Sequence, residues 1–204
     1  MIHVLADALF GEPIPISEFP HRPELKGFGM SDWGYDSRLA EKLGYTNTFY
    51  DTEPKLDITD PPPDCLGTLD FLISSDVFEH VPPPVQRAFD GAFALLKPGG
   101  VLVLTVPYNE GKTREHFPNL GEWQIVDFNG VHVLLNRTSE GWEVHDGLHF
   151  HGGPGLTLEM RHFGREDIHS HLEKAGFREI TDWHDAEEFH PWSDVHGLPF
   201  TARK

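Results

Sequence analysis

The chain has 204 residues, which is enough for one domain with a substantial core. Its 33 Asp and Glu residues outnumber 16 Lys and Arg residues, so the formal net charge is −17 with histidine neutral. A surface of this sign repels phosphate backbones and anionic lipid headgroups, and no cluster of Lys and Arg opposes it, so we expect no nucleic-acid or membrane partner.

The cysteine content and the apolar segments indicate where the protein works. The single cysteine, Cys65, excludes an internal disulfide and a CxxC metal motif. No apolar run approaches the ~20 residues needed to cross a bilayer. The apolar start, residues 1–12, lacks a cationic flank and predicts a short helix rather than a signal peptide. We therefore expect a cytoplasmic protein.

The first part of the chain predicts a strand, a helix and a second strand. Residues 25–30 read as a short strand that runs into a turn. Residues 36–43 have the apolar spacing of a helix, which Gly44 ends. Residues 45–50 are rich in Thr and aromatic side chains, which is typical of a strand.

A third strand is expected near Leu56, but the segment leading to it is too short for a regular repeat. A parallel neighbour needs a crossover of roughly a dozen residues. None fits between Tyr50 and Leu56. One crossover helix is therefore missing from the α/β pattern.

The middle of the chain predicts a strand, a helix and a strand in succession. Residues 69–74 are almost continuously apolar, as in a strand buried on both faces. Residues 85–96 carry apolar side chains at helical spacing, between three prolines and the stop signal at 97–100. Residues 101–107 form the next buried strand, so the unit is a right-handed parallel one.

An antiparallel insertion is predicted over about residues 122–155. Asn129-Gly130 suits a type I′ turn between two strands, and residues 142–144 read as a third strand. The parallel pattern returns afterwards with a helix at 165–174 and two closing strands, at 177–183 and 198–202. The expected product is a β-meander inserted into a single domain that spans residues 1–204.

Glycines and acids gather where the predicted parallel strands end, which is where open sheets bind ligands. Glycine lets the backbone approach a ligand closely, one acid can accept both hydroxyls of a ribose, and another can accept from an adenine amino group. The set has the chemistry of a nucleoside-binding crevice. These candidate residues are Gly27, Phe28, Gly29, Ser31, Asp32, Glu53, Asp57, Ser75 and Asp76.

Two stretches resemble class I S-adenosylmethionine-dependent methyltransferases of the type 11 kind. They are LDFLISSDVFEHVPPPVQRAFDGAFALLKPGGVLVLTVPY, which resembles the region after that family's fourth strand, and FGREDIHSHLEKAGFREI, which resembles its late helix and strand. The resemblance covers about residues 25–120 and 160–204. It implies an α/β Rossmann-like sheet in the order 3-2-1-4-5-7-6 with an antiparallel last strand. It also implies S-adenosylmethionine as cofactor.

The glycine motif of that family is degenerate in this chain. Gly27 stands where the family has an acid, and Gly29 matches the first glycine of the motif. Ser31 and Trp33 replace the next two glycines. We expect Asp32 to take over from the missing acid as the partner of the cofactor's ammonium group.

The resemblance also implies roles for the other candidate residues. Glu53 is expected to bind the cofactor's ribose, with Asp51 as the alternative, and Asp57 to contact the adenine. Ser75 and Asp76 are expected to line the crevice. The acceptor is an unidentified small molecule, glycan or protein, and the candidate base that removes its proton is His80 or a histidine of the insertion.

Two other functions are compatible with the sequence. The chain could be a non-catalytic nucleoside-binding or interaction module that kept the sheet and lost the glycine loop. It could also be a metal-dependent enzyme that uses the cluster between His145 and His162. His149 and His151 would share one face of a strand, but no third ligand follows from their spacing, so no metal is predicted. The oligomeric state stays open.

The insertion itself has two possible roles. We expect the β-meander to form a lid over the crevice that selects the acceptor, with the glycine-rich turn at 150–155 lying at the mouth of the site. The alternative is a stabilising flap or a dimer contact, in which Trp123, Phe128 and Trp142 bury against another subunit.

Overall fold

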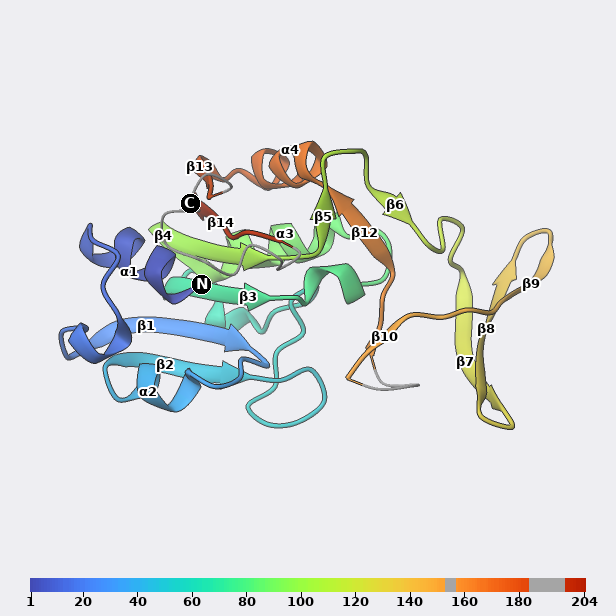
Figure 1. Ribbon diagram of the computed structural model, residues 1–204, viewed down its shortest axis with the longest axis horizontal. Helices are drawn as coiled ribbons and strands as arrows, with labels where there is room; N and C mark the ends of the chain where they lie inside the picture. The colour runs from blue at the N-terminus through green and yellow to red at the C-terminus, as the bar shows by residue number, and fades with distance from the viewer. Residues whose placement is uncertain (153–156, 184–196) are drawn as a thin grey trace.

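The structure is a computed structural model that describes residues 1–152, 157–183 and 197–204 (Figure 1). Its core is a six-stranded sheet in the order β13-β14-β4-β3-β1-β2. The first four strands in sequence run parallel, and β14 is antiparallel to both of its neighbours. The bounds are β1 Arg22–Met30, β2 Leu43–Thr48, β3 Leu69–Ser75, β4 Leu96–Thr105, β13 Arg178–Asp182 and β14 Phe200–Arg203.

This sheet confirms the predicted α/β Rossmann-like class and six positions of the predicted strand order. The prediction of a third strand near Leu56 is wrong. In the described part of the chain, Lys55 forms only an isolated bridge with Phe49. The chain turns straight back on itself here. The Phe49 N–H donates to the Pro54 carbonyl and the Leu56 N–H donates to the Phe49 carbonyl. Without a crossover helix, this segment cannot lay a further parallel strand beside β2.

Helices cover both faces of the sheet. α1 (Ile2–Phe10) and α2 (Asp36–Ala40) pack on one face, where Phe71 and Ile73 of β3 point. α3 (Gln86–Leu95) and α4 (Arg165–Ala175) pack on the other face, where Leu72 points. The apolar run in β3 is therefore buried from both sides, as predicted. No helix among the described residues is long and apolar enough to cross a membrane.

Two predicted element ends are wrong, each for a local reason. The helix predicted to reach Leu43 stops at Ala40, and Gly44 lies inside β2 rather than ending a helix. A Cβ at Gly44 would lie 2.4 Å from the Pro23 carbonyl oxygen, so the glycine allows close pairing of the strands. Residues 97–100, predicted as a turn, belong to β4. Their pairing with β3 is irregular, because the register shifts between Leu69 and Phe71.

The predicted insertion is a three-stranded antiparallel sheet of β7 (Glu122–Phe128), β8 (Val131–Thr138) and β9 (Gly141–His145). Asn129 and Gly130 have φ angles of 53° and 85°, which confirms the type I′ turn. Figure 1 shows this sheet standing beyond the carboxyl ends of the central strands.

Short elements connect the insertion to the main sheet. Phe117, Leu134, Leu158 and Met160 form a small core at its base. The glycine-rich turn falls largely at 153–156, outside the described residues. The remaining bounds are η1 Ile16–Glu18, η2 Pro63–Cys65, η3 Phe78–His80, β5 Tyr108–Asn109, β6 Arg114–Glu115, β10 Phe150–His151, β11 Thr157–Leu158 and β12 Arg161–Gly164.

Candidate active site

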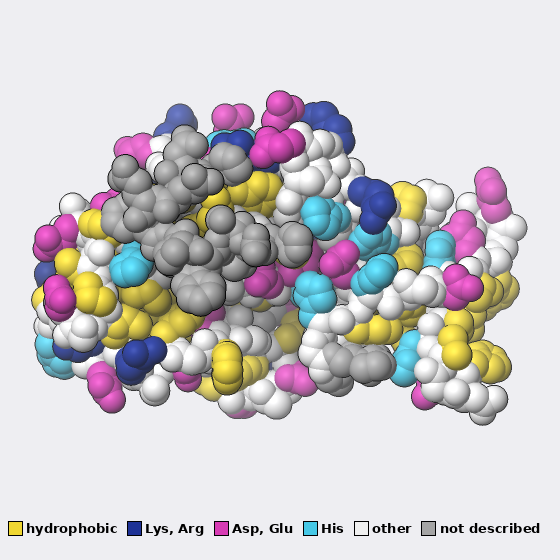
Figure 2. Space-filling model, viewed as in Figure 1, with side chains coloured by type: hydrophobic (Ala, Val, Ile, Leu, Met, Phe, Trp, Pro, Cys, Tyr) yellow, Lys and Arg dark blue, Asp and Glu magenta, His cyan; other side chains and the backbone are white. Residues whose placement is uncertain are grey.

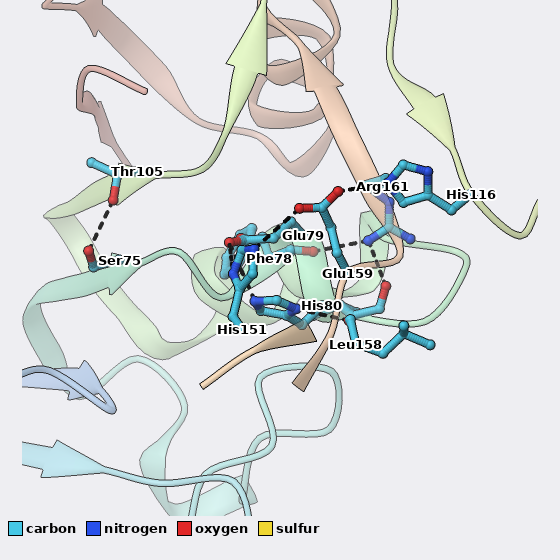
Figure 3. A network of polar contacts seen from close by, with 11 residues as sticks. Ser75, Phe78, Glu79, His80, Thr105, His116, His151, Leu158, Glu159 and Arg161 are labelled. Carbon is cyan, nitrogen blue, oxygen red and sulfur yellow. Dashed lines mark hydrogen bonds and ion pairs between the residues drawn. The ribbon is translucent and has the colours of Figure 1, made fainter. Parts of the chain in front are cut away.

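Polar side chains mark the carboxyl ends of β3 and β4. The Ser75 and Thr105 hydroxyls lie 3.1 Å apart across the two strands (Figure 3). Asp76 follows with a φ of 52°, and its N–H donates to the Thr105 carbonyl over 3.0 Å. The left-handed turn at Asp76 leaves its side chain exposed at the edge of the sheet. The structure therefore places both predicted crevice residues at this edge.

The loop after β1 is held by side chains of β2. The Tyr45 hydroxyl donates to Asp32 Oδ2 over 2.6 Å. Asn47 accepts from the Asp32 N–H at 2.9 Å and donates to the Asp32 carbonyl at 2.8 Å. Asp32 is only 7% exposed, and burial raises the pKa of its carboxyl group.

The other oxygen of this carboxyl group is less well satisfied. Asp32 Oδ1 and the buried Tyr35 hydroxyl form no hydrogen bond of good geometry among the described residues, although the hydroxyl lies close enough to act on the pKa of Asp32 as a donor would. A buried acceptor without a partner is costly. The pair therefore marks a place suited to a donor from a ligand, above all a cationic one.

The two glycines of the degenerate motif are required by packing. A Cβ at Gly27 would lie 2.2 Å from the Phe71 ring, which fills the space that an acid would need. A Cβ at Gly29 would lie 2.0 Å from both Asp32 Oδ2 and the Tyr45 hydroxyl. Ser31, two residues further along, has a φ of 59° and begins the loop. This chain thus has its carboxyl group at Asp32, and Phe71 explains why none stands at position 27.

The two predicted acids after β2 lie on a loop that turns back towards the sheet. Glu53 is exposed, and its Oε2 accepts from the Lys55 N–H over 3.1 Å. Asp57 Oδ1 accepts from the backbone N–H and the hydroxyl of Thr59, at 2.8 and 2.7 Å. Asp57 therefore holds a local turn, and the contacts of both acids with a cofactor stay predictions.

A buried carboxylate lies one turn beyond β3. Glu79, in η3, is 0% exposed, and neither of its oxygens has a hydrogen-bond partner among the described residues. Burial raises the pKa of Glu79 to about 8, and the negative charges of Asp76 and Glu159 add to this effect.

Two histidines face this carboxylate from different parts of the chain (Figure 3). His80 Nε2 lies 3.5 Å from Glu79 Oε1, while His80 Nδ1 lies 2.9 Å from the Leu158 carbonyl oxygen. His151, in β10, places Nδ1 3.8 Å from the same Glu79 oxygen. The two imidazole rings meet edge to face with centroids 4.6 Å apart. Burial lowers the pKa of His80, which favours the neutral imidazole.

Residues around β12 hold this cluster in place. Glu159 Oε2 lies 3.3 Å from His151 Nε2, and its Oε1 accepts from His116 Nε2 at 2.7 Å. Burial alone would raise the pKa of Glu159, but the hydrogen bond from His116 holds this pKa below its usual value. The fully buried Arg161 donates to the carbonyls of Phe78 and Val81, and so fixes the two ends of η3.

The sequence predicted His80 as a site residue, whereas the adjacent Glu79 was not among the candidates. The sequence groups His151 with His145, His149 and His162. Of these four histidines, only His151 joins Glu79 and His80 in a group of described residues that could hold a metal ion. His145 instead lies 3.5 Å from Glu143, and His162 Nδ1 is 3.2 Å from the Asn109 amide. Figure 2 shows histidine and acidic side chains gathered on this face between the sheet and the insertion.

The structure is thus an α/β protein with polar side chains gathered at the carboxyl ends of its parallel strands. The chain belongs to the methyltransferase domain family, whose model matches residues 28–182. This match confirms the methyltransferase family that the resemblance implied. No curated protein matches the chain significantly in sequence.

Several solved structures share the fold of this chain. An S-adenosylmethionine-dependent methyltransferase from Mesorhizobium loti aligns with a TM-score of 0.53 and 15% identity, over 92% of this chain and 94% of that one. The 1,6-didemethyltoxoflavin-N1-methyltransferase of Burkholderia thailandensis, with its substrate and S-adenosylhomocysteine bound, aligns with a TM-score of 0.55 and 15% identity. That alignment covers 100% of this chain and 76% of that one. The carbon methyltransferase CurJ gives 0.57 and 14%, over 100% and 54%.

The residues at the edge of the sheet fit the family's cofactor. Oδ1 of Asp32 suits the ammonium group of its methionine part. The exposed Asp76 and the half-buried Ser75 offer an acceptor and a hydroxyl at the ends of the central strands. The donor set thus agrees with S-adenosylmethionine even though the glycine motif is degenerate.

Proposed function

We propose that this methyltransferase acts on an oxygen or nitrogen atom of a neutral or cationic small molecule or glycan, held beside Glu79, His80 and His151. The observation that carries the proposal is the position of these three side chains beyond β3, on the same edge as Ser75 and Asp76. The net charge of −17 favours an acceptor that is not a polyanion. A protein segment is the alternative acceptor. The solved relatives support only the fold, since one is named for nitrogen and another for carbon methylation.

The cofactor-binding roles are proposed as the sequence predicted them. The loop residues Gly27, Phe28, Gly29 and Ser31 would lie along the methionine part, with Asp32 bonding its ammonium group. Glu53 would bind the ribose and Asp57 the adenine, while Ser75 and Asp76 would line the crevice.

His80 is the proposed base. S-adenosylmethionine supplies an already activated methyl group, so the chain must orient the acceptor, exclude water and remove a proton. The short contact of His80 Nδ1 with the Leu158 carbonyl requires the hydrogen on Nδ1. His80 Nε2 is then an unprotonated acceptor beside Glu79, and it can take the proton of a hydroxyl or amine.

The insertion is proposed to select the acceptor. The support is that the chain returning from the meander forms β10, which brings His151 to within 3.8 Å of Glu79. The small core at the base of the meander, which includes Leu134 and Leu158, links the meander to this returning segment.

The test is a methyl-transfer assay that follows S-adenosylhomocysteine formation with a panel of small hydroxyl and amine acceptors and glycans. We expect His80→Asn to lower kcat by about 10²–10⁴-fold, the range for loss of a general base, with unchanged cofactor affinity. His149→Asn is the matched control, since His149 lies outside the ligand group. Equal kcat values for both variants and the wild type would contradict the role of His80.

A further inference from the structure

The geometry points to a binding site for a divalent transition-metal ion formed by Glu79, His80 and His151. This inference deepens the proposed function, since the same cluster is proposed to hold the acceptor. Metal binding can be measured without an acceptor, so the two proposals can fail separately. The residues come from η3 and β10, which lie far apart in sequence.

The ligand atoms already have nearly the separation that a metal needs. One ligand atom from each residue lies within 4.8 Å of the other two. Glu79 Oε1 is 3.5 Å from His80 Nε2 and 3.8 Å from His151 Nδ1. Ligands about 2.1 Å from a tetrahedral ion are about 3.4 Å apart. To bind such an ion, His80 Nε2 and His151 Nδ1 would therefore need to approach Glu79 Oε1 by only a few tenths of an ångström.

The other nitrogen of each ring is held so that the free lone pair faces the site. The Leu158 carbonyl, 2.9 Å away, places the hydrogen of His80 on Nδ1. Glu159 Oε2 lies 3.3 Å from His151 Nε2 without forming a hydrogen bond in this structure, so it is placed to accept one from Nε2 after a small rotation of the ring. Histidine ligands of metals characteristically donate their second N–H to a carbonyl or a carboxylate, which fixes the ring and the tautomer. His80 Nε2 then presents its lone pair towards Glu79, and His151 Nδ1 would do so with the hydrogen on Nε2.

Glu79 supplies a second, independent indication of a cation. Both of its oxygens are buried and lack a hydrogen-bond partner among the described residues. The buried cation nearby, Arg161, bonds Glu115 and the carbonyls of Phe78 and Val81 through Nε and Nη1, whereas its Nη2 has no hydrogen-bond partner among the described residues. A buried carboxylate is stable only when it is paired, protonated or bound to a metal. The carboxylate is aimed into the same space as the two imidazoles (Figure 3).

The ligand set favours one class of ion and one role. Two imidazoles and one carboxylate suit Zn²⁺, Mn²⁺, Fe²⁺ or Co²⁺ better than Ca²⁺ or Mg²⁺. Three protein ligands leave a position open for the acceptor's oxygen, whose pKa the ion lowers. The hydroxyl proton then leaves to water, and the oxygen–methyl bond forms as the sulfur–methyl bond breaks. In the loaded protein His80 is a ligand, and it can act as a base only in the ion-free protein.

The test is calorimetric titration of the chelator-treated full chain with Zn²⁺, and with Co²⁺ followed by its visible absorption. We expect one site in the wild type. Glu79→Gln and His151→Asn, made separately, should each weaken Zn²⁺ binding by at least tenfold. Glu159→Gln should weaken it by about tenfold, because Glu159 only orients His151. His149→Asn, two residues from His151 on the same segment, should bind as the wild type does.

The outcomes separate the two proposals. Zn²⁺ affinities that are the same in the wild type, Glu79→Gln and His151→Asn would overturn the metal site. Binding of S-adenosylhomocysteine, measured in parallel, shows that each variant keeps its fold. If the ion is not bound while His80-dependent methyl transfer persists, only the metal inference fails. If the ion binds with the expected variant pattern but no acceptor is methylated, the metal site stands and the proposed acceptor chemistry fails.

Discussion

Gly27 shows how one side chain decides whether the family's glycine motif can be kept. It pairs directly with Phe71 across β1 and β3, and the Phe71 ring also stacks on Tyr45 with centroids 6.3 Å apart. An acid at position 27 would have to displace this ring. The carboxyl group of the loop is at Asp32 instead, where Tyr45 holds one of its oxygens.

Gly27→Ala should therefore destabilise the protein through overpacking rather than through loss of cofactor binding. The added Cβ would lie 2.2 Å from the Phe71 ring, so we expect the free energy of unfolding to fall by about 1–3 kcal/mol. Urea denaturation measures this change. Phe71→Leu in the same chain should recover part of the loss, because neighbouring sites couple. Strictly additive effects would contradict this packing explanation.

Glu53→Ala should weaken binding of S-adenosylhomocysteine by about 1–3 kcal/mol, or roughly 5–150-fold in Kd, if Glu53 holds the ribose. The reason is its position just beyond β2, where the loop returns from Phe49 to Leu56. Asp51→Ala is the matched control on the same loop. An unchanged Kd for Glu53→Ala together with a weaker one for Asp51→Ala would assign the ribose to Asp51.

The sequence pattern could predict these site residues only in part. The polar residues after a buried strand led to the prediction of Ser75, Asp76 and His80, which the structure places beyond that strand. The burial of Glu79 could not be predicted from the local sequence. It depends on β12 and on the Met160 N–H, which donates to the Glu79 carbonyl. The contact between His80 and His151 joins two segments whose pairing no local pattern indicates.

At the level of elements, the two helices on one face of the sheet meet at a half-buried histidine. His171 of α4 stacks on Phe89 of α3 with ring centroids 4.9 Å apart, and its Nδ1 lies 2.7 Å from Gln86 Oε1. Burial lowers the pKa of His171 in the folded protein. The unfolded chain therefore takes up a proton at higher pH than the folded chain does.

This difference makes the packing of α3 on α4 sensitive to acid. Stability from neutral His171 is present above its unfolded pKa of about 6.5 and is lost as the pH falls below it. His171→Phe keeps the ring and removes the titration. We expect wild-type stability to fall more steeply than that of the variant between about pH 6.5 and pH 5, as measured by urea denaturation. Parallel curves would show that His171 does not carry this pH dependence.

Element order was more predictable than element ends. The strand-helix-strand unit from β3 to β4 follows from hydrophobic spacing alone, because both faces of the strands are buried. The ends of α2 and α3 depend on strand pairing instead. Gly44 must lie against the Pro23 carbonyl, and Leu96 pairs with Leu69. Such pairings form between distant residues, so local helix signals placed both ends too late.

At the scale of the whole molecule, the acidic chain has two parts with different exposure of apolar surface. The central sheet buries its apolar residues in two clusters, one on each face. The meander leaves large apolar side chains in solvent, with Phe128 at 62% and Trp142 at 64% exposure. Exposed apolar groups of this size on one small sheet mark a binding surface, for an acceptor or for another subunit.

Removal of the meander distinguishes these two uses. Residues 122–145 would be replaced by a short Gly-Ser linker, with the base of the insertion and β10 retained. If the meander selects the acceptor, cofactor affinity should change by less than about threefold, while turnover collapses or the acceptor range broadens. The cofactor is expected to survive because its proposed contacts lie on β1, β2 and β3, away from the replaced strands.

The control for this replacement is the oligomeric state, measured by sedimentation for both proteins at the same concentration. A wild-type dimer that becomes monomeric on removal of the meander would show that Phe128 and Trp142 bury against a second subunit. Loss of cofactor binding in a folded variant would contradict the lid assignment, because it would place the meander in the cofactor site. Unchanged turnover with every acceptor would also contradict the lid assignment, because the replaced strands would then contribute nothing to acceptor choice. The lid assignment requires the remaining result, in which cofactor affinity and oligomeric state are kept and only acceptor use changes.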